Sequence, residues 1–277
     1  MDTNSLKPEA FSAVAYNPVP NSENRIHGDE VARSHGFRGG LVPGVVVSAY
    51  LLDPALRAFG LAALRGSYAD VVVHKPLYDG TRFDVRIEVC DEQGYRAALC
   101  DAEGTRCGEA SFELARAPSE IPRFDAQMAR APRSAERPSA CREVFERLQL
   151  EGMGSLRARL DAEHEMTRYH ATLDAQPELV RPEPSRYAGF AFLLGLTDWA
   201  IARNVKLGPW LHLQTWSHQL AAVPFGSELV IQPKVVELFE RKGHQFVDID
   251  VAAFDAAQTA VLAARMRCIY ELRRSDQ

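Results

Sequence analysis

Two long apolar segments, each followed by a run of alternating strand-like residues, constrain the fold of this chain most strongly. Residues 41–59 (LVPGVVVSAYLLDPALRAF) and 187–204 (YAGFAFLLGLTDWAIARN) carry apolar side chains on every side. The valine run in the first segment is a weak helix former, so its pattern alone leaves a strand open, but its length favours a helix. A helix that is apolar all round has to be enclosed. We therefore predict two buried helices.

The segments after the two helices read as antiparallel strands in the same order. Period-2 alternation and turn residues mark strands and hairpins in both halves. The predicted strands are YADVVVHKPLY, RFDVRIEV and a hairpin over YRAALCDAEGTRCGEASFEL in the first half, and LHLQTWSHQLAAV, ELVIQPKVVELFER, HQFVDIDVAAFD and TAVLAARMRCIYELRR in the second. The turn DGT at 79–81 corresponds to FGS at 225–227. This order predicts an α+β fold made of two similar units, each a helix wrapped by a curved antiparallel sheet.

Residues 116–140 divide these two units. They are rich in Pro, Ala, Ser and Arg, a composition typical of a linker. The predicted boundaries are 1–115 for the first unit and 141–277 for the second. The two units should pack together, because each sheet has to cover its edge and its second face.

Composition narrows the class of protein. The chain has 277 residues, 46% of them hydrophobic and 25% charged, as in ordinary globular proteins. Its formal net charge of -5 argues against nucleic acid as a partner. The N-terminus is polar and acidic, unlike a signal peptide, and the apolar run 44–52 is too short to span a bilayer.

The cysteines add a prediction about location. There are five of them, an odd number, and none forms a CxxC pair. Neither a disulfide framework nor a zinc site is indicated, so no metal is predicted. We expect a cytoplasmic protein with reduced thiols and no contact with a membrane.

The stretch NSENRIHGDEVARSHGFRGGLVPG, residues 21–44, contains the first candidate site. His27 follows Asn24 by three residues, and a glycine-rich turn then leads into the first apolar segment. A lone NxxH in a loop is usually structural, with Asn bonding its own backbone. The turn and the helix that follow favour a site, in which a neutral His27 could act as a base.

SENRIH resembles the signature of the MaoC-like or (R)-specific enoyl-CoA hydratases, a family of hotdog proteins. That signature reads Asp, any residue, Asn, Pro, an aliphatic residue and His, and it matches Asn24, Ile26 and His27. GLVPG resembles the step that begins the hotdog helix, with Gly44 on the family's glycine. The motif covers residues 22–48, whereas the hotdog pattern covers nearly the whole chain, twice. The resemblance implies a double hotdog fold.

Three positions depart from the family pattern. Ser22 stands where the catalytic Asp belongs, Arg25 replaces Pro, and Pro43 replaces a second His. Ser22 can hold a water but cannot take its proton at neutral pH. The implied hydratase site is therefore atypical.

The resemblance implies hydration of 2-enoyl thioesters or dehydration of 3-hydroxyacyl thioesters. His27, Asn24, Ser22 and Gly44 are the implied catalytic residues, with backbone N–H groups at the helix start stabilising the enolate. The small-molecule acyl thioester carries coenzyme A or an acyl carrier, so no separate cofactor is expected. Arg25 and Arg38 are candidates for binding its phosphates. A homodimer is left open.

The second half has no NxxH, but LTDWA places Asp198 within its apolar helix. This resembles the catalytic-helix aspartate of hotdog acyl-CoA thioesterases, including the double-hotdog acyl-CoA thioesterase II type. A thioesterase that uses Asp198 is therefore one alternative, and a non-catalytic acyl-thioester binder is another. The plainer interpretations make Asp198 a hydrogen-bonded core carboxylate and His212 and His218 surface or packing residues.

Overall fold

The computed structural model describes residues 7–130, 137–161, 164–169, 173, 177–180 and 187–273. Part of the predicted linker (131–136) and part of the stretch before the second helix (181–186) lie outside the described residues.

Ten strands form one sheet, and every neighbouring pair is antiparallel. The strands are β1 (Phe11–Val14), β2 (Ser67–Val73), β3 (Arg82–Cys90), β4 (Gly94–Asp101), β5 (Arg106–Leu114), β6 (Leu156–Arg159), β7 (Leu211–Gln219), β8 (Glu228–Arg241), β9 (His244–Phe254) and β10 (Ala260–Glu271). Their order is β1-β3-β4-β5-β2-β7-β10-β9-β8-β6. The first five strands come from the first half of the chain, and the pairing of β2 with β7 joins them to the second half.

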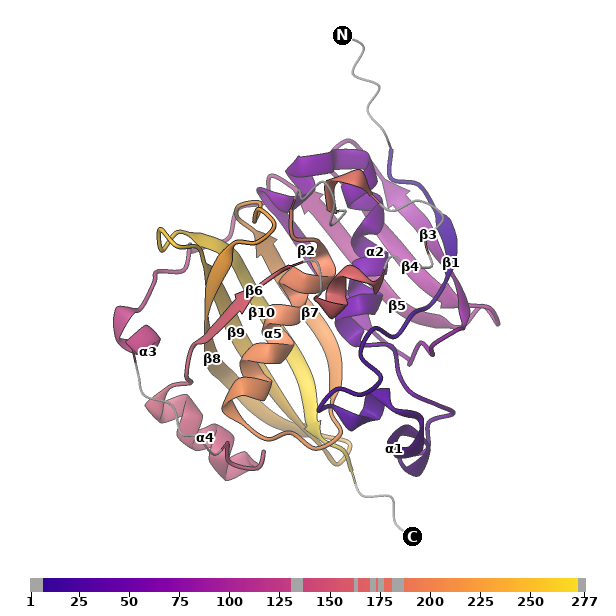
Figure 1. Cartoon of the computed structure of the whole chain (residues 1–277). Helices are drawn as coiled ribbons and strands as arrows, with labels where there is room; N and C mark the ends of the chain where they lie inside the picture. Colours follow the sequence, from indigo (N-terminus) through magenta and orange to yellow (C-terminus); the bar gives the residue numbers. More distant parts are fainter. Residues whose placement is uncertain are drawn as a thin grey trace.

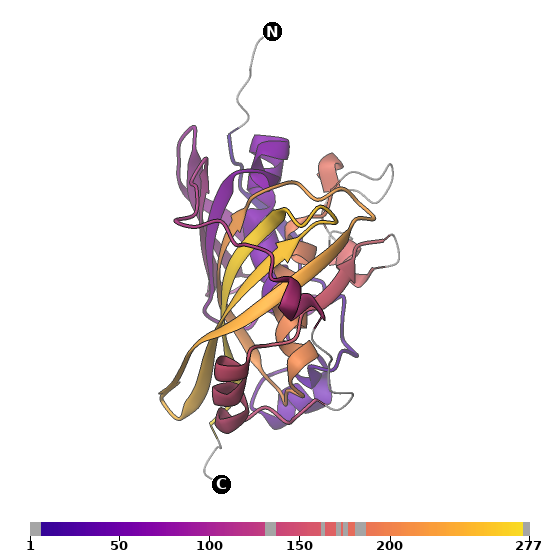
Figure 2. The ribbon, with the colours of Figure 1, turned by 90° about the vertical axis from the view of Figure 1, so that its left-hand side faces the viewer.

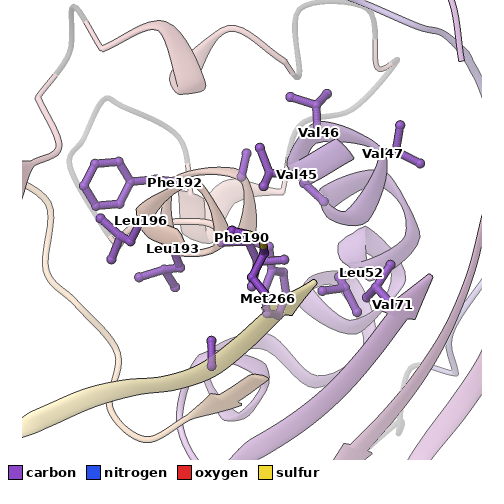
Figure 3. Close-up of a cluster of buried hydrophobic side chains, with 14 of the residues drawn as sticks. Val45, Val46, Val47, Leu52, Val71, Phe190, Phe192, Leu193, Leu196 and Met266 are labelled. Atoms are coloured by element: carbon purple, nitrogen blue, oxygen red, sulfur yellow. The ribbon is translucent and has the colours of Figure 1, made fainter. Parts of the chain in front are cut away.

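Two long helices lie side by side against the sheet, which curves around them (Figures 1 and 2). They are α2 (Gly44–Phe59) and α5 (Phe190–Asn204), as predicted. Every residue of α2 from Val45 to Leu56 is buried. Figure 3 shows apolar side chains from both helices meeting in one core. The fold is α+β, as the all-round apolar character of the helices predicted.

The two halves repeat a detail at the start of each helix. Leu41 forms an isolated bridge with Tyr78, and Tyr187 forms one with Pro224. These residues are extended rather than helical, so both helices begin about three residues later than the apolar segments do. In the first half the boundary has a clear cause, because Pro43 occupies the position before the helix and cannot continue a helix backwards.

The strand predicted over residues 68–78 is shorter than the prediction. β2 ends at Val73, and the regular ladder stops there, because the N–H groups of His74 and Lys75 both donate to the carbonyl of Cys107 on β5. Pro76 lies in this segment and has no N–H to donate to a neighbouring strand. The shortening matters because residues 73–77 line part of the cavity described below.

The remaining helices and 3-10 turns are short. They are α1 (Asp29–Ser34), α3 (Ala126–Arg130) and α4 (Arg142–Glu151), with 3-10 turns η1 (Arg25–His27), η2 (Gly60–Leu64), η3 (Glu165–Thr167) and η5 (Glu178–Val180). The described part of the linker packs on β8, where Asp125 and Gln232 exchange two hydrogen bonds of 2.9 and 2.7 Å.

Among the described residues, one helical stretch (Gly44–Leu64) is long and apolar enough to cross a membrane. In the most apolar 18 residues of this stretch, 67% is buried within the protein. This stretch contains α2, the helix that the sheet encloses.

Candidate active site

Two cavities meet where the loop of the first half reaches the helix of the second. Their volumes are about 470 and about 280 Å³. Asn24, His27, Asp198 and Trp210 line both. The walls otherwise come from both halves and are largely apolar, which suits an apolar ligand with a few polar groups for orientation.

The backbone on both sides of η1 holds His27 in place. Its Nδ1 lies 2.7 Å from the carbonyl oxygen of Leu41, in the extended segment before α2. A carbonyl only accepts, so Nδ1 carries the hydrogen. In the neutral ring Nε2 is then the acceptor, and the amide nitrogen of Asn24 lies 3.3 Å from it. The lone pair of Nε2 is thus on the side of the ring that faces Asn24.

Asn24 joins the two halves rather than bonding its own loop. Its Nδ2 donates to the carbonyl of Trp210 at 3.1 Å, and its Oδ1 accepts from the Trp210 N–H at 3.3 Å. Trp210 comes directly before β7, 186 residues along the chain. The plainer sequence interpretation, in which Asn caps its own backbone, is therefore wrong. Asn24 fixes the first-half loop to the second-half strand and also contacts His27.

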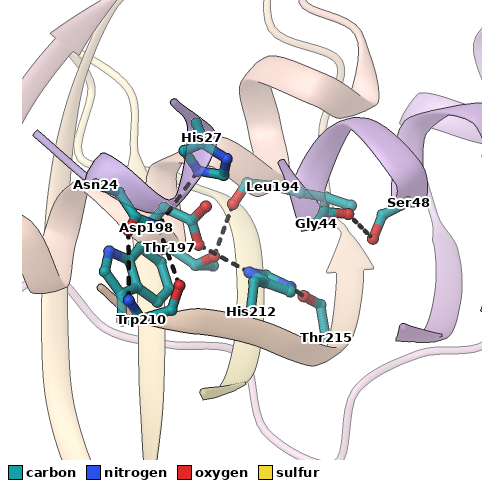
Figure 4. Close-up of polar contacts among 10 residues, drawn as sticks. All are labelled: Asn24, His27, Gly44, Ser48, Leu194, Thr197, Asp198, Trp210, His212 and Thr215. Atoms are coloured by element: carbon teal, nitrogen blue, oxygen red, sulfur yellow. Dashed lines mark hydrogen bonds and ion pairs between the residues drawn. The ribbon is translucent and has the colours of Figure 1, made fainter. Parts of the chain in front are cut away.

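The side chain of His212 holds one carboxylate oxygen of Asp198 and leaves the other without a hydrogen bond from the described residues. Its Oδ1 lies 2.8 Å from Nδ1 of His212, whose Nε2 lies 2.6 Å from Oγ1 of Thr215 (Figure 4). Within the described part of the chain, Oδ2 accepts no hydrogen bond. The Asp198 side chain is 15% exposed and borders both cavities. Asp198 is therefore not a sealed core carboxylate. His212, predicted as a surface or packing residue, is buried and bonded to it.

The start of α2 forms the third side of the site. Pro43 precedes the helix, and its carbonyl accepts from the N–H groups of Val46 and Val47. No side chain caps the N-terminus, and the N–H groups of Gly44 and Val45 donate to no described residue. Gly44 lines the smaller cavity and Val45 the larger. A Cβ on Gly44 would meet Cβ of His212 at 2.8 Å. The absence of a side chain at Gly44 therefore makes room for His212.

We expect Gly44→Ala to destabilise the protein by about 1–3 kcal/mol, the usual cost of overpacking a filled site. The added methyl would have to displace His212 from its contact with the helix start. Urea unfolding of Gly44→Ala and Gly208→Ala would measure the effect, because nothing lies within 4 Å of a Cβ added at Gly208. Equal stability of the two variants would contradict the tight contact.

The electrostatics favour a neutral His27. Burial lowers the pKa of His27 below its ordinary value, while the hydrogen bond to the Leu41 carbonyl and the charge of Asp198 act in the opposite direction. Burial prevails because it removes water from the imidazolium. A histidine with a lowered pKa is an unprotonated base at neutral pH.

This lowered pKa predicts that acid destabilises the fold. The unfolded chain protonates His27 near its ordinary pKa of about 6.5, whereas the folded chain resists until a lower pH. The free energy of unfolding is therefore unaffected by His27 above about pH 6.5. It decreases as the pH falls from there through the folded-state pKa of His27. The thermal midpoint should therefore fall between pH 7 and pH 5, and it should fall less in His27→Gln. Equal slopes for the two proteins would contradict this assignment.

The remaining predicted residues fall in different places. Ser22 lines the larger cavity, and its hydroxyl donates to the carbonyl of Asn24 at 3.3 Å. Arg25 and Arg38 are exposed and line neither cavity. Arg38 lies over the ring of Tyr78, 4.4 Å from its centroid, and 3.6 Å from Glu103.

Sequence reasoning missed the roles of three residues. His212 lies in a segment whose alternating pattern indicated a strand and gave the histidine only a surface or packing role. Trp210 contributes its backbone groups, which no pattern of side chains reveals. Lys75 lies on the wall of the smaller cavity because β2 ends early. Within the described ranges, no group of three or more His, Cys, Asp or Glu side chains is arranged to hold a metal ion.

Similar folds occur in solved structures. A conserved hypothetical protein of Mycobacterium tuberculosis with a double hotdog fold matches at a TM-score of 0.61 and 14% identity, over 95% of this chain and 96% of its own. A protein described as a MaoC domain dehydratase, from Chloroflexus aurantiacus, matches at 0.58 and 9%, over 99% and 100%. A protein described as a thioesterase II, from Thermobifida fusca, matches at 0.52 and 14%, over 98% and 96%.

The sequence itself matches no protein-family model and no curated protein. At these low identities the structural likeness speaks to the fold alone. It extends over nearly the whole length of both chains, and it agrees with the enclosed pair α2 and α5 and with the ten-stranded antiparallel sheet. The chain therefore has the double hotdog fold.

Proposed function

We propose that this protein acts on acyl thioesters, as a hydratase of 2-enoyl thioesters or a dehydratase of 3-hydroxyacyl thioesters. The observation that carries the proposal is that His27 and Asp198 border the same two cavities. Sequence reasoning assigned them to two competing functions. Together they supply a neutral base and a carboxylate. The family pattern led us to expect that the carboxylate was missing, because Ser22 occupies its usual position.

The chemistry needs one water and no external proton. Nε2 of His27 takes a proton from the water as its oxygen bonds to C3 of the enoyl group, and the same proton passes to C2. The carboxylate of Asp198 favours the transient imidazolium, since its charge raises the pKa of His27. The 3.3 Å contact from Asn24 to Nε2 is long and can give way to the water.

Negative charge on the thioester oxygen also needs a partner. The first turn of α2 has no side-chain cap, and Gly44 lines the smaller cavity while Val45 lines the larger. A helix N-terminus favours anions, so it can stabilise the enolate. The two cavities would then hold the acyl chain and the arm of coenzyme A or of an acyl carrier. The carrier is part of the substrate, and no separate cofactor is proposed.

A thioesterase is the second candidate, and a specific observation supports it. Oδ2 of Asp198 accepts no hydrogen bond from the described residues, and Asp198 borders the cavity, as a carboxylate that activates water for attack on the thioester carbonyl would. The same residues could also serve a protein that binds acyl thioesters without reaction.

A substrate panel separates these three functions. The protein is incubated with enoyl-, 3-hydroxyacyl- and saturated acyl-coenzyme A of several chain lengths. Loss of the enoyl absorbance reports hydration, and a thiol reagent reports hydrolysis. Hydration without thiol release is the expected result. Thiol release from saturated substrates would favour the thioesterase, and binding without either reaction would favour the non-catalytic function.

The position of Ser22 supplies a further prediction. The family resemblance predicts that Ser22→Asp increases hydration, up to about 10²- to 10⁴-fold if the carboxylate is correctly aimed. With Asp198 already beside the cavity, we expect the gain mainly in the Asp198→Asn background. Initial rates of Ser22→Asp, Asp198→Asn and the double variant measure this. If Ser22→Asp adds no activity in either background, the proposed equivalence of the two positions is wrong.

A further inference from the structure

A buried chain of polar side chains stands behind Asp198. His212 bonds Oδ1 of Asp198 at 2.8 Å through Nδ1 and Oγ1 of Thr215 at 2.6 Å through Nε2. Thr215 is fully buried, and the His212 side chain is 3% exposed. Both residues lie on β7, while Asp198 lies on α5. These hydrogen bonds therefore connect the second long helix to the strand that joins the two halves.

The donors and acceptors along this chain can be assigned. An ionised carboxylate only accepts, so Nδ1 of His212 donates to Asp198. In the neutral ring, Nε2 then accepts from the hydroxyl of Thr215. The carboxylate of Asp198 therefore selects the tautomer in which Nδ1, rather than Nε2, carries the hydrogen, and the Thr215 hydroxyl supplies the partner of Nε2. The other tautomer would leave Asp198 facing a ring nitrogen that cannot donate.

The ring of His212 is also fixed by packing. Cβ, Cγ and Cδ2 of His212 lie 2.8 to 3.1 Å from the place where a side chain on Gly44 would begin. The start of α2 therefore packs closely against His212, which also contacts Asp198 of α5 (Figure 4). Hydrogen bonds and packing together leave the ring one orientation.

We propose that His212 is a positioning residue that holds Oδ1 of Asp198, so that Oδ2 points to the cavity shared with His27, and that Thr215 holds the ring of His212 from its Nε2 side. This inference rests on the proposed function, because it assigns Asp198 a part in the chemistry. It adds two residues that neither the sequence motif nor the fold identifies.

Three substitutions test the proposal. His212→Asn keeps an N–H near the position of Nδ1, His212→Leu removes the donor, and Thr215→Val keeps the shape but loses the hydroxyl. We expect His212→Leu to lower kcat by about 10- to 10²-fold with KM little changed, since a misplaced catalytic group costs this much. His212→Asn should recover most of that loss, and Thr215→Val should lower kcat less than His212→Leu does.

Thermal midpoints separate positioning from folding. Both His212 variants remove the ring and should lose similar stability, so the difference in kcat between them reports the hydrogen bond. The proposal is overturned if His212→Leu keeps the kcat of the unmodified protein, or if His212→Asn loses as much kcat as His212→Leu at a similar midpoint.

A readout that needs no activity keeps this inference distinct from the proposed function. Histidine ring ¹⁵N spectra of the full chain should show His212 with a protonated Nδ1 and an unprotonated Nε2. Thr215→Val should keep this tautomer and shift the Nε2 signal, because only the hydrogen bond to Nε2 is lost. If the spectra behave so and no thioester reacts, the proposed function fails while the positioning stands. A protonated Nε2 on a neutral His212 would overturn the positioning directly.

Discussion

His27→Ala should lower kcat/KM for hydration of a 2-enoyl thioester by about 10²- to 10⁴-fold, the usual cost of removing a general base. The loss is expected because His27 is the only histidine among the described residues that lines both cavities. Its Nε2 therefore supplies the neutral nitrogen base. Initial rates followed at the enoyl absorbance would measure it, and the reverse dehydration should fall by the same factor.

His35→Ala is the matched control for this substitution. His35 is exposed, ends α1 a short distance along the same loop and lines neither cavity. It should keep full activity. A His27→Ala protein that folds normally and hydrates as fast as His35→Ala would rule out His27 as the base.

Asp198→Asn should lower hydration by a similar factor, about 10²- to 10⁴-fold, while the fold persists. The amide has the shape of the carboxylate but cannot carry its charge, so it no longer favours an imidazolium at His27. If the protein is a thioesterase, the same change should remove hydrolysis of saturated acyl-coenzyme A instead. The products therefore tell which reaction Asp198 serves.

Asp250→Asn is a suitable control, because Asp250 pairs with Arg265 at 2.6 Å and lines neither cavity. The double variant His27→Ala with Asp198→Asn provides the sharpest comparison. Residues that act as a unit lose activity together, so the double variant should be little slower than either single variant. Losses that multiply would mean that the two residues work independently, which contradicts a shared site.

Much of the architecture followed from local patterns. The apolar segments around α2 and α5 had to be enclosed, and the alternating segments after them had to pair, because period and burial are properties of a short stretch of chain. The ends of elements were less predictable. β2 stopped at Val73 because of the segment that contains Pro76, and α2 started at Gly44 because of Pro43.

The sequence by itself determined the two enclosed helices, the repeated order of strands and the residues worth testing, among them His27, Asn24, Gly44 and Asp198. Each of these has a local signature of spacing or polarity. Only the tertiary structure decided which of them meet. The pairing of β2 with β7 brings Asn24 to Trp210, 186 residues away, and puts His27 and Asp198 on the walls of the same cavities. No local pattern contains that information, because contacts between distant segments depend on how the two halves of the sheet join.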